Sequence, residues 1–110
     1  MPSVAAEQHV VSEIVRRLVA SLDPDKIVLF GSRARGDSDA HSDIDLLIVK
    51  ASQEPRHKRV GRAHRALIGL GIPVDILWYT PEEAAACSRL RQHVASRALR
   101  EGQVLYEREP

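Results

Sequence analysis

The chain has 110 residues, 44% of them hydrophobic and 28% charged, and its formal net charge at pH 7 is +1. This length and composition are typical of one soluble globular domain spanning residues 1–110, and the near-neutral charge gives no reason to expect nucleic acid or a membrane surface as the main partner. No stretch is long and apolar enough to cross a bilayer, the N-terminus lacks the features of a secretory signal, and the single cysteine fits a reducing cytoplasm.

The first predicted element is a helix from Val4 to Leu22, in which apolar side chains recur at helical spacing along one face. Asp23-Pro24 ends this helix, because proline disfavours helical geometry in the residue before it. Lys26 to Phe30 follows as a strand that is apolar on both faces, as expected for an interior strand covered by helices. After it the sequence predicts a short helix at 33–37, a loop at 37–42 and a second strand at 43–49.

A second long helix is predicted at 54–69, with an apolar stripe on one side and a run of basic residues on the other. Such a charge run is more often a solvated surface than a binding site, but it would also suit an acidic partner or substrate. The sequence leaves both interpretations open. The basic residues assigned to this outer face are Arg56, Lys58, Arg59, Arg62 and Arg65.

The last third of the chain begins with a predicted strand, Val74 to Tyr79. Thr80-Pro81-Glu82-Glu83 then forms a capping box with proline at the first helical position, which predicts a helix running from there to Gly102. Cys87 lies on the apolar stripe of this helix and is interpreted as a small core residue. Residues 104–106 are expected to add a short strand at the sheet edge. Together these elements predict an α/β fold, with a mixed sheet of three or four strands flanked by about four helices.

The most informative stretch of the chain joins the first two strands. The first strand ends in Gly31-Ser32, and Asp43 and Asp45 stand where the second strand begins, with ten residues between Ser32 and Asp43. Because strand side chains alternate between faces, the two carboxylates lie on the same face, about 6.5–7 Å apart at Cα. Carboxylates this close repel each other unless something neutralises them, and a divalent metal ion is the usual agent.

Gly31-Ser32 suits a phosphate-binding corner. Glycine permits tight backbone geometry and close approach of a ligand, and serine can cap a helix whose exposed N–H groups bind phosphate. Because Mg²⁺ prefers a few carboxylates together with phosphate oxygens, this corner beside a carboxylate pair favours a nucleoside triphosphate with bound Mg²⁺ as the ligand. Arg33 and Arg35 could neutralise phosphate charge, but they could equally pair with the acids of the following loop.

Asp75 is a lone acid in the third predicted strand, between Val74 and Ile76. A buried ionised carboxylate is costly unless it is paired or bound to a metal ion. We therefore expect Asp75 to be the third carboxylate of the site. The alternative is that Asp75 caps a neighbouring helix or pairs with an arginine.

Gly31-Ser32 followed after ten residues by Asp43-x-Asp45 resembles the signature of the polymerase-β-type nucleotidyltransferases. The fuller strings at 31–36 (GSRARG) and 42–46 (SDIDL) resemble the minimal nucleotidyltransferase (MNT) branch of that family. The resemblance is good over about residues 27–79. It implies a polymerase-β-like nucleotidyltransferase fold, ATP as substrate and a pair of Mg²⁺ ions.

The resemblance also implies a role for each residue of the motif. Asp43 and Asp45 would hold the metal ions. Asp75 would bind the metal ion that activates the attacking hydroxyl, or would act as its base. Gly31 and Ser32 would hold the β- and γ-phosphates, with the two arginines that follow as further candidates for phosphate binding.

Residues 80–110 provide one helix and a tail after the third strand, whereas larger relatives append a helical domain that holds the acceptor. Small members of the family are commonly encoded beside helical HEPN-type partner proteins. The resemblance therefore implies an antitoxin that transfers AMP from ATP to a tyrosine of a ribonuclease toxin. Two alternatives stay open: a binding module that neutralises a partner by contact alone, and an enzyme acting on a small hydroxylated molecule. The sequence identifies neither the nucleotide base nor whether the chain forms a homo-oligomer.

Overall fold

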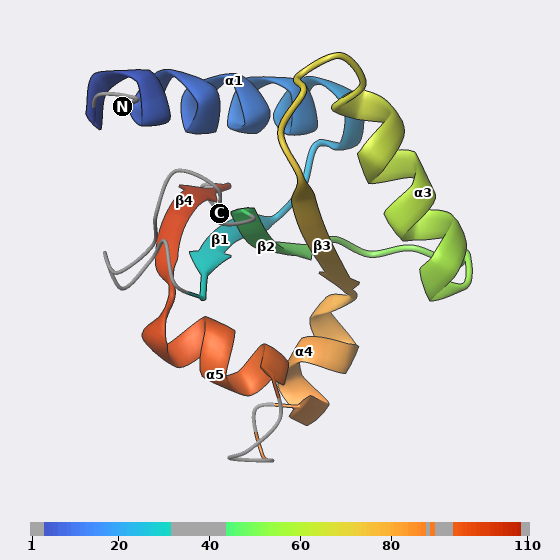
Figure 1. Cartoon of the computed structure of the whole chain (residues 1–110). Helices are drawn as coiled ribbons and strands as arrows, with labels where there is room; N and C mark the ends of the chain where they lie inside the picture. The colour runs from blue at the N-terminus through green and yellow to red at the C-terminus, as the bar shows by residue number, and fades with distance from the viewer. Residues whose placement is uncertain (1–3, 32–43, 88, 90–93, 109–110) are drawn as a thin grey trace.

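The computed structural model describes residues 4–31, 44–87, 89 and 94–108 (Figure 1). Helix α1 and strands β1 and β3 have the bounds predicted from the sequence, and the edge strand expected near the C-terminus is present. The helices are α1 (Val4–Leu22), α3 (Arg56–Ala66), α4 (Pro81–Cys87) and α5 (Val94–Glu101), and the strands are β1 (Lys26–Phe30), β2 (Ile44–Val49), β3 (Val74–Tyr79) and β4 (Gln103–Glu107).

The four strands form one sheet in the order β3-β2-β1-β4. Strand β1 pairs antiparallel with both β2 and β4, while β2 pairs parallel with β3. Helix α3 connects the two parallel strands, because parallel pairing needs a crossover connection and cannot be made by a tight turn. The sheet is therefore mixed, and the architecture confirms the α/β fold expected from the sequence.

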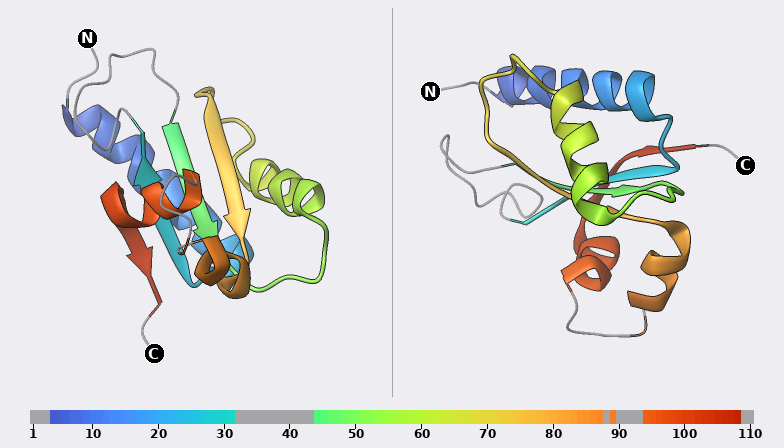
Figure 2. Two further views of the ribbon diagram at one scale, coloured as in Figure 1. Left: turned by 90° about the horizontal axis from the view of Figure 1, so that it is seen from below. Right: turned by 90° about the vertical axis from the view of Figure 1, so that its right-hand side faces the viewer.

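Helices cover both faces of the sheet, with α1 and α3 on one face and α4 and α5 on the other (Figure 2). The first face carries the larger core cluster, in which Leu18 of α1 and Ala63 of α3 pack with Ile27, Leu46 and Trp78 of the sheet. The face under α4 and α5 carries a smaller cluster. Strand residues alternate between the two clusters, which explains why β1 and β2 are apolar on both faces. The buried members of this second cluster are Val28, Leu47, Tyr79, Ala84 and Ala98.

The prediction of a single helix from Pro81 to Gly102 is wrong, because α4 ends at Cys87 and α5 begins at Val94. A straight helix over 81–101 would be about 30 Å long, whereas strands of five or six residues are about 17–20 Å long. Two short helices can both remain over the sheet, and each contributes a buried alanine to the second cluster. The second helix also leads the chain back to β4 at the far edge.

The short helix predicted at 33–37 and the loop predicted at 37–42 lie outside the described residues. The helix predicted at 54–69 is shorter than expected at both ends. Within the part of the chain that the structure describes, no helix is long and apolar enough to cross a membrane.

Candidate active site

Asp45 and Asp75 lie side by side at one end of the sheet. The parallel register pairs Asp45 of β2 with Asp75 of β3, and the antiparallel register pairs Asp45 with Phe30 of β1. Neighbouring strands are about 4.8 Å apart, so these three residues form a row across three strands. Strand alternation puts the row on the face covered by α4 and α5, because Leu47 and Tyr79 on the same side of their strands belong to the second cluster.

Side chains on this face become less buried toward the carboxylates. Along β3, Tyr79 is buried, Leu77 is half-buried and Asp75 is exposed, while Asp45 on β2 is half-buried. Helix α4 begins directly after β3, so it covers the end of the strand at Tyr79 and leaves the end at Asp75 uncovered. The pair of carboxylates is therefore accessible to a ligand at the end of the sheet where β2 and β3 begin.

The expectation that Asp75 would be a buried carboxylate is wrong. Strand β3 is at the edge of the sheet, and its first residues extend beyond the helices that cover its other end. Desolvation therefore does not force Asp75 to find a partner. Among the described residues, Asp75 neither caps a helix nor pairs with an arginine, which were the alternatives to a role in the site.

Gly31 packs directly against the carboxylate of Asp45. It has a φ of +76°, and a Cβ atom added to it would lie 2.3 Å from Oδ2 of Asp45 and 3.2 Å from its Cγ. A side chain at this position would strain the backbone and displace the carboxylate. The residue after β1 thus brings backbone without a side chain beside Asp45, and the close approach of a ligand expected at this glycine stays a prediction.

The other residues assigned to the site lie outside the described ranges: Ser32, Arg33, Arg35 and Asp43. Within those ranges, no group of three or more potential metal-ligating side chains occurs, so the described site is a pair of carboxylates. Mg²⁺ is commonly held by one or two carboxylates and completes its octahedral shell with substrate phosphates and water. The pair of Asp45 and Asp75, with bare backbone at Gly31, fits a Mg²⁺ ion that is bound together with phosphate.

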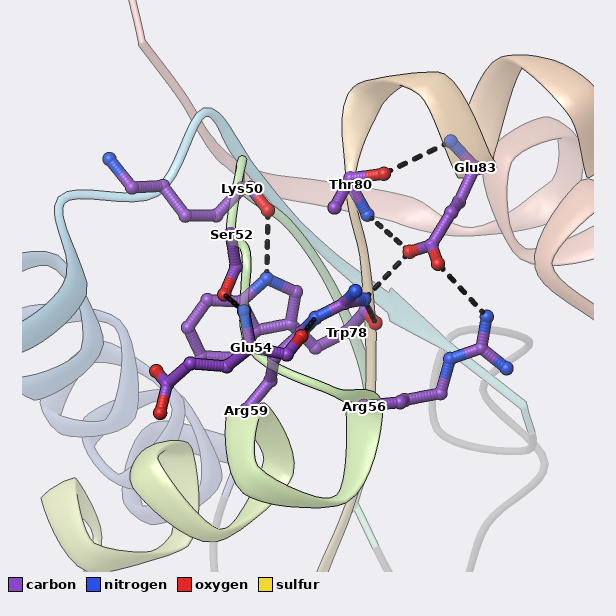
Figure 3. A network of polar contacts seen from close by, with 8 residues as sticks. All are labelled: Lys50, Ser52, Glu54, Arg56, Arg59, Trp78, Thr80 and Glu83. Atoms are coloured by element: carbon purple, nitrogen blue, oxygen red, sulfur yellow. Dashed lines mark hydrogen bonds and ion pairs between the residues drawn. The ribbon is translucent and has the colours of Figure 1, made fainter.

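The prediction that Arg59 lies on the basic outer face of α3 is wrong. Arg59 is buried, and its guanidinium donates hydrogen bonds to Oε1 of Glu83 at 2.7 Å and to the carbonyl oxygens of Glu54 at 2.8 Å and Trp78 at 3.3 Å (Figure 3). Arg62 forms an ion pair with Glu54. Much of the positive charge of α3 is therefore engaged within the molecule.

Arg56 is exposed but contacts two neighbouring side chains, with its guanidinium carbon 4.4 Å from the centre of the Tyr79 ring and Nη2 3.6 Å from Oε2 of Glu83. Burial raises the pKa of Tyr79, although the nearby charge of Arg56 acts in the opposite direction. Lys58 and Arg65 remain exposed on the outer face. Arg56 and Arg62 are exposed as well, so four of the five basic residues predicted for this face are at the surface and Arg59 is the exception.

The capping box at the start of α4 is confirmed. The Thr80 N–H donates to Oε1 of Glu83 at 2.9 Å, and the Glu83 N–H donates to Oγ1 of Thr80 at 3.1 Å. The hydrogen bond from Arg59, followed by that from the Thr80 N–H, lowers the pKa of Glu83. The ionised carboxylate of Glu83 thus joins α3, α4 and the C-terminal end of β3. Asp75 lies at the other end of the same strand.

Phe30 was not predicted to be part of the site. In the sequence it is one of several apolar residues in the first strand, and nothing local distinguishes it. Only the register of β1 with β2 shows that it lies next to Asp45. A signal was nevertheless available, because Phe30 directly precedes Gly31 in the motif.

Solved structures that resemble this chain share its fold. A candidate nucleotidyltransferase from Sulfolobus solfataricus has a TM-score of 0.65 and 24% identity, covering 91% of this chain and 79% of that chain. A toxin–antitoxin structure with AMP-PNP has a TM-score of 0.61 and 20% identity, covering 90% of this chain and 74% of that chain. A mutant of the toxin–antitoxin MntA-HpeT has a TM-score of 0.58 and 19% identity, with coverage of 90% and 74%. At these identities the likeness shows the fold alone.

The comparison with protein families is more specific. The sequence has no significant match among curated proteins. It does match the family described as the nucleotidyltransferase domain over residues 10–105, a range that runs from α1 into β4 and includes Gly31, Asp45 and Asp75. The chain therefore belongs to the nucleotidyltransferase domain family.

Proposed function

We propose that this chain transfers a nucleoside monophosphate from a nucleoside triphosphate to a hydroxyl group at the carboxylate pair. The observation that supports this most directly is the arrangement of Gly31, Asp45 and Asp75 at the uncovered end of the sheet, with bare backbone pressed against one carboxylate. A purely structural strand end has no need for two adjacent acids, because like charges directly opposite each other destabilise a sheet.

In the proposed reaction the acceptor oxygen attacks the α-phosphorus, an O–P bond forms, and the bond between the α-phosphorus and the bridging oxygen breaks. Pyrophosphate leaves with the electrons of that bond. The proton of the acceptor hydroxyl is lost, and Asp75 is the candidate to accept it at a carboxylate oxygen because it is the exposed member of the pair. Its alternative role is to bind metal alongside Asp45.

Asp45, Asp75 and, outside the described residues, Asp43 are the proposed ligands of Mg²⁺. Bound there, the metal would neutralise charge on the attacking and leaving oxygens. Gly31 is the proposed contact of the β- and γ-phosphates through its backbone. Ser32, Arg33 and Arg35 are proposed to bind the same phosphates.

ATP is the proposed nucleotide, and a tyrosine of a helical HEPN-type toxin is the proposed acceptor, which makes the chain an antitoxin. Two of the similar structures support the antitoxin role and an adenine nucleotide, since one is a toxin–antitoxin structure with AMP-PNP and another is the toxin–antitoxin MntA-HpeT. The identity of the nucleotide and of the acceptor both depend on that analogy.

The test is to co-express the chain with the product of the neighbouring gene, purify the complex, add ATP and Mg²⁺, and measure the intact mass of both proteins. We expect the partner to become heavier by one or more AMP groups with the wild-type chain and with Glu82→Gln, an exposed acid in α4 that serves as the matched control. Asp75→Asn should give no mass change while the complex still forms.

An unmodified partner whose toxicity is suppressed equally by wild type and Asp75→Asn would support a binding module that acts by contact alone. Transfer to small hydroxylated compounds, with no change in any protein mass, would support the other alternative. Either result would contradict the protein acceptor proposed above.

A further inference from the structure

The chain has four aromatic residues, all within the described ranges, and Phe30 differs from the other three. Trp78 and Tyr79 are buried, and Tyr106 packs against the first core cluster on the opposite face of the sheet. Phe30 packs against the second cluster but is only half-buried. It is therefore the one aromatic side chain of the protein that lies on the face of the carboxylates and keeps part of its surface accessible.

The position of Phe30 is fixed by the sheet. It is the antiparallel partner of Asp45, and residues directly opposite in such a pair have Cβ atoms about 4.5–5.5 Å apart. Asp75 lies on the other side of Asp45, so the row consists of an aromatic ring, a half-buried carboxylate and an exposed carboxylate. Gly31 follows Phe30 directly and contacts the same carboxylate of Asp45.

On β1 and β2, the apolar residues of this face that precede or follow the row are less accessible than the row itself. Val28, two residues before Phe30, and Leu47, two residues after Asp45, are fully covered by the helices. The second cluster therefore covers Phe30 less completely than Val28 and Leu47. Phe30 is half-buried and is the strand partner of Asp45, so stacking of a second planar ring on its side chain would remove apolar surface from water.

We propose that Phe30 binds the planar ring of a substrate at this site. The proposal rests on the proposed function, which supplies two such rings: the base of the nucleotide and the phenol of an acceptor tyrosine. A phosphate chain at Gly31 and metal at Asp45 would both be adjacent to Phe30, so a ring carried by the same ligand lies within reach. Phe30 would then determine affinity for the ring, while the carboxylates and Gly31 act on the phosphates.

The test compares two ligands that share the phosphate chain but differ in the ring. Calorimetry with Mg²⁺ measures binding of the non-hydrolysable ATP analogue AMP-PNP and of inorganic tripolyphosphate to the full chain. For Phe30→Leu we expect affinity for AMP-PNP to fall about tenfold, within the range of base–aromatic stacking, and affinity for tripolyphosphate to stay unchanged. Phe30→Tyr keeps the ring and should bind AMP-PNP like the wild type.

Leu99→Ala is the matched control, because Leu99 of α5 is also half-buried against the second cluster but lies outside the row. Leu99→Ala should lower thermal stability without changing either affinity. A cooperative thermal unfolding transition of Phe30→Leu would show that this variant is folded. If AMP-PNP binding is unchanged in Phe30→Leu, the acceptor ring is examined by NMR with N-acetyl-tyrosinamide in the presence of AMP-PNP. Line broadening of the phenol that is lost in Phe30→Leu would assign the ring to the acceptor.

Two results would overturn the inference while the proposed function stands. One is equal weakening of AMP-PNP and tripolyphosphate by Phe30→Leu, which would mean that the residue only positions Asp45 and Gly31. The other is no effect on any of the three ligands. Failure of wild type to bind either phosphate ligand would instead remove the proposed function, and this inference with it.

Discussion

Gly31 carries a positive φ of +76° and faces the carboxylate of Asp45, so no other residue fits there without displacing the acid. We expect Gly31→Ala to destabilise the fold by about 1–3 kcal/mol, because it forces an alanine into the left-handed region against a fixed neighbour. It should also weaken Mg²⁺-dependent nucleotide binding. Urea unfolding and calorimetry measure the two effects.

Gly61→Ala is the control for that substitution. Gly61 lies inside α3, and a Cβ added there would meet no heavy atom of the described chain within 4 Å. Alanine is the better helix former, so this variant should gain about 0.5–1 kcal/mol and bind nucleotide normally. Equal behaviour of the two variants would mean that Gly31 is not constrained as the structure indicates.

The sequence was enough to group three described residues, Gly31, Asp45 and Asp75, but it did not predict how accessible they are. The spacing of Gly31 and Asp45 in the sequence identified the residues that the structure brings into contact. The lone position of Asp75 in an apolar strand identified the acid that the register places beside Asp45. Strand order decided the rest: Asp75 is exposed because β3 is at the sheet edge, and Phe30 joins the row because β1 pairs with β2.

At the scale of elements, Glu83 links α3 to α4 and the end of β3. Because its pKa is lowered in the folded state, chiefly by the hydrogen bond from Arg59, its stabilisation is complete above the ordinary value of 4.5 and is lost as the pH falls through the lowered value. We expect Glu83→Gln to cost about 1–3 kcal/mol at pH 7, since it leaves the buried Arg59 without a carboxylate partner. Urea unfolding from about pH 7 to about pH 3 should show the difference from wild type shrinking toward zero.

Glu82→Gln, which changes the adjacent exposed acid, should alter stability by about 0.5 kcal/mol or less across the same range. A gap between wild type and Glu83→Gln that stays constant with pH would contradict the ionic role of Glu83. The test therefore separates the charge of this residue from its packing.

The same network shows why helix α3 was only partly predictable. Helical periodicity located the helix and its apolar stripe, but a run of cations at almost every exposed position does not reveal which of them turns inward. Arg59 is buried because Glu83 and two backbone carbonyls receive its guanidinium, and these partners come from separate elements. In the same way, the capping box predicted where α4 begins, but its end depends on the length of the sheet that it covers.

For the whole molecule, helices on both faces share one sheet, and strand β2 contributes to both core clusters. Neither cluster can be lost without exposing residues of the same central strands. We expect the chain to unfold as a single domain in one cooperative transition. Fluorescence of Trp78, which is 3% exposed in the first cluster, and far-ultraviolet circular dichroism should give coincident urea curves. Two separate midpoints would show that the layer of α4 and α5 is independent of the rest.

The central claim is that Asp45, Asp75 and Gly31 form one metal-dependent nucleotide site, and the most direct test is calorimetric binding of AMP-PNP with and without Mg²⁺. We predict Mg²⁺-dependent binding by the wild-type chain, a loss of affinity of about tenfold or more in Asp45→Asn with the fold intact, and wild-type affinity in Glu82→Gln. Binding that is indifferent to Mg²⁺, or that survives Asp45→Asn unchanged, would contradict the account.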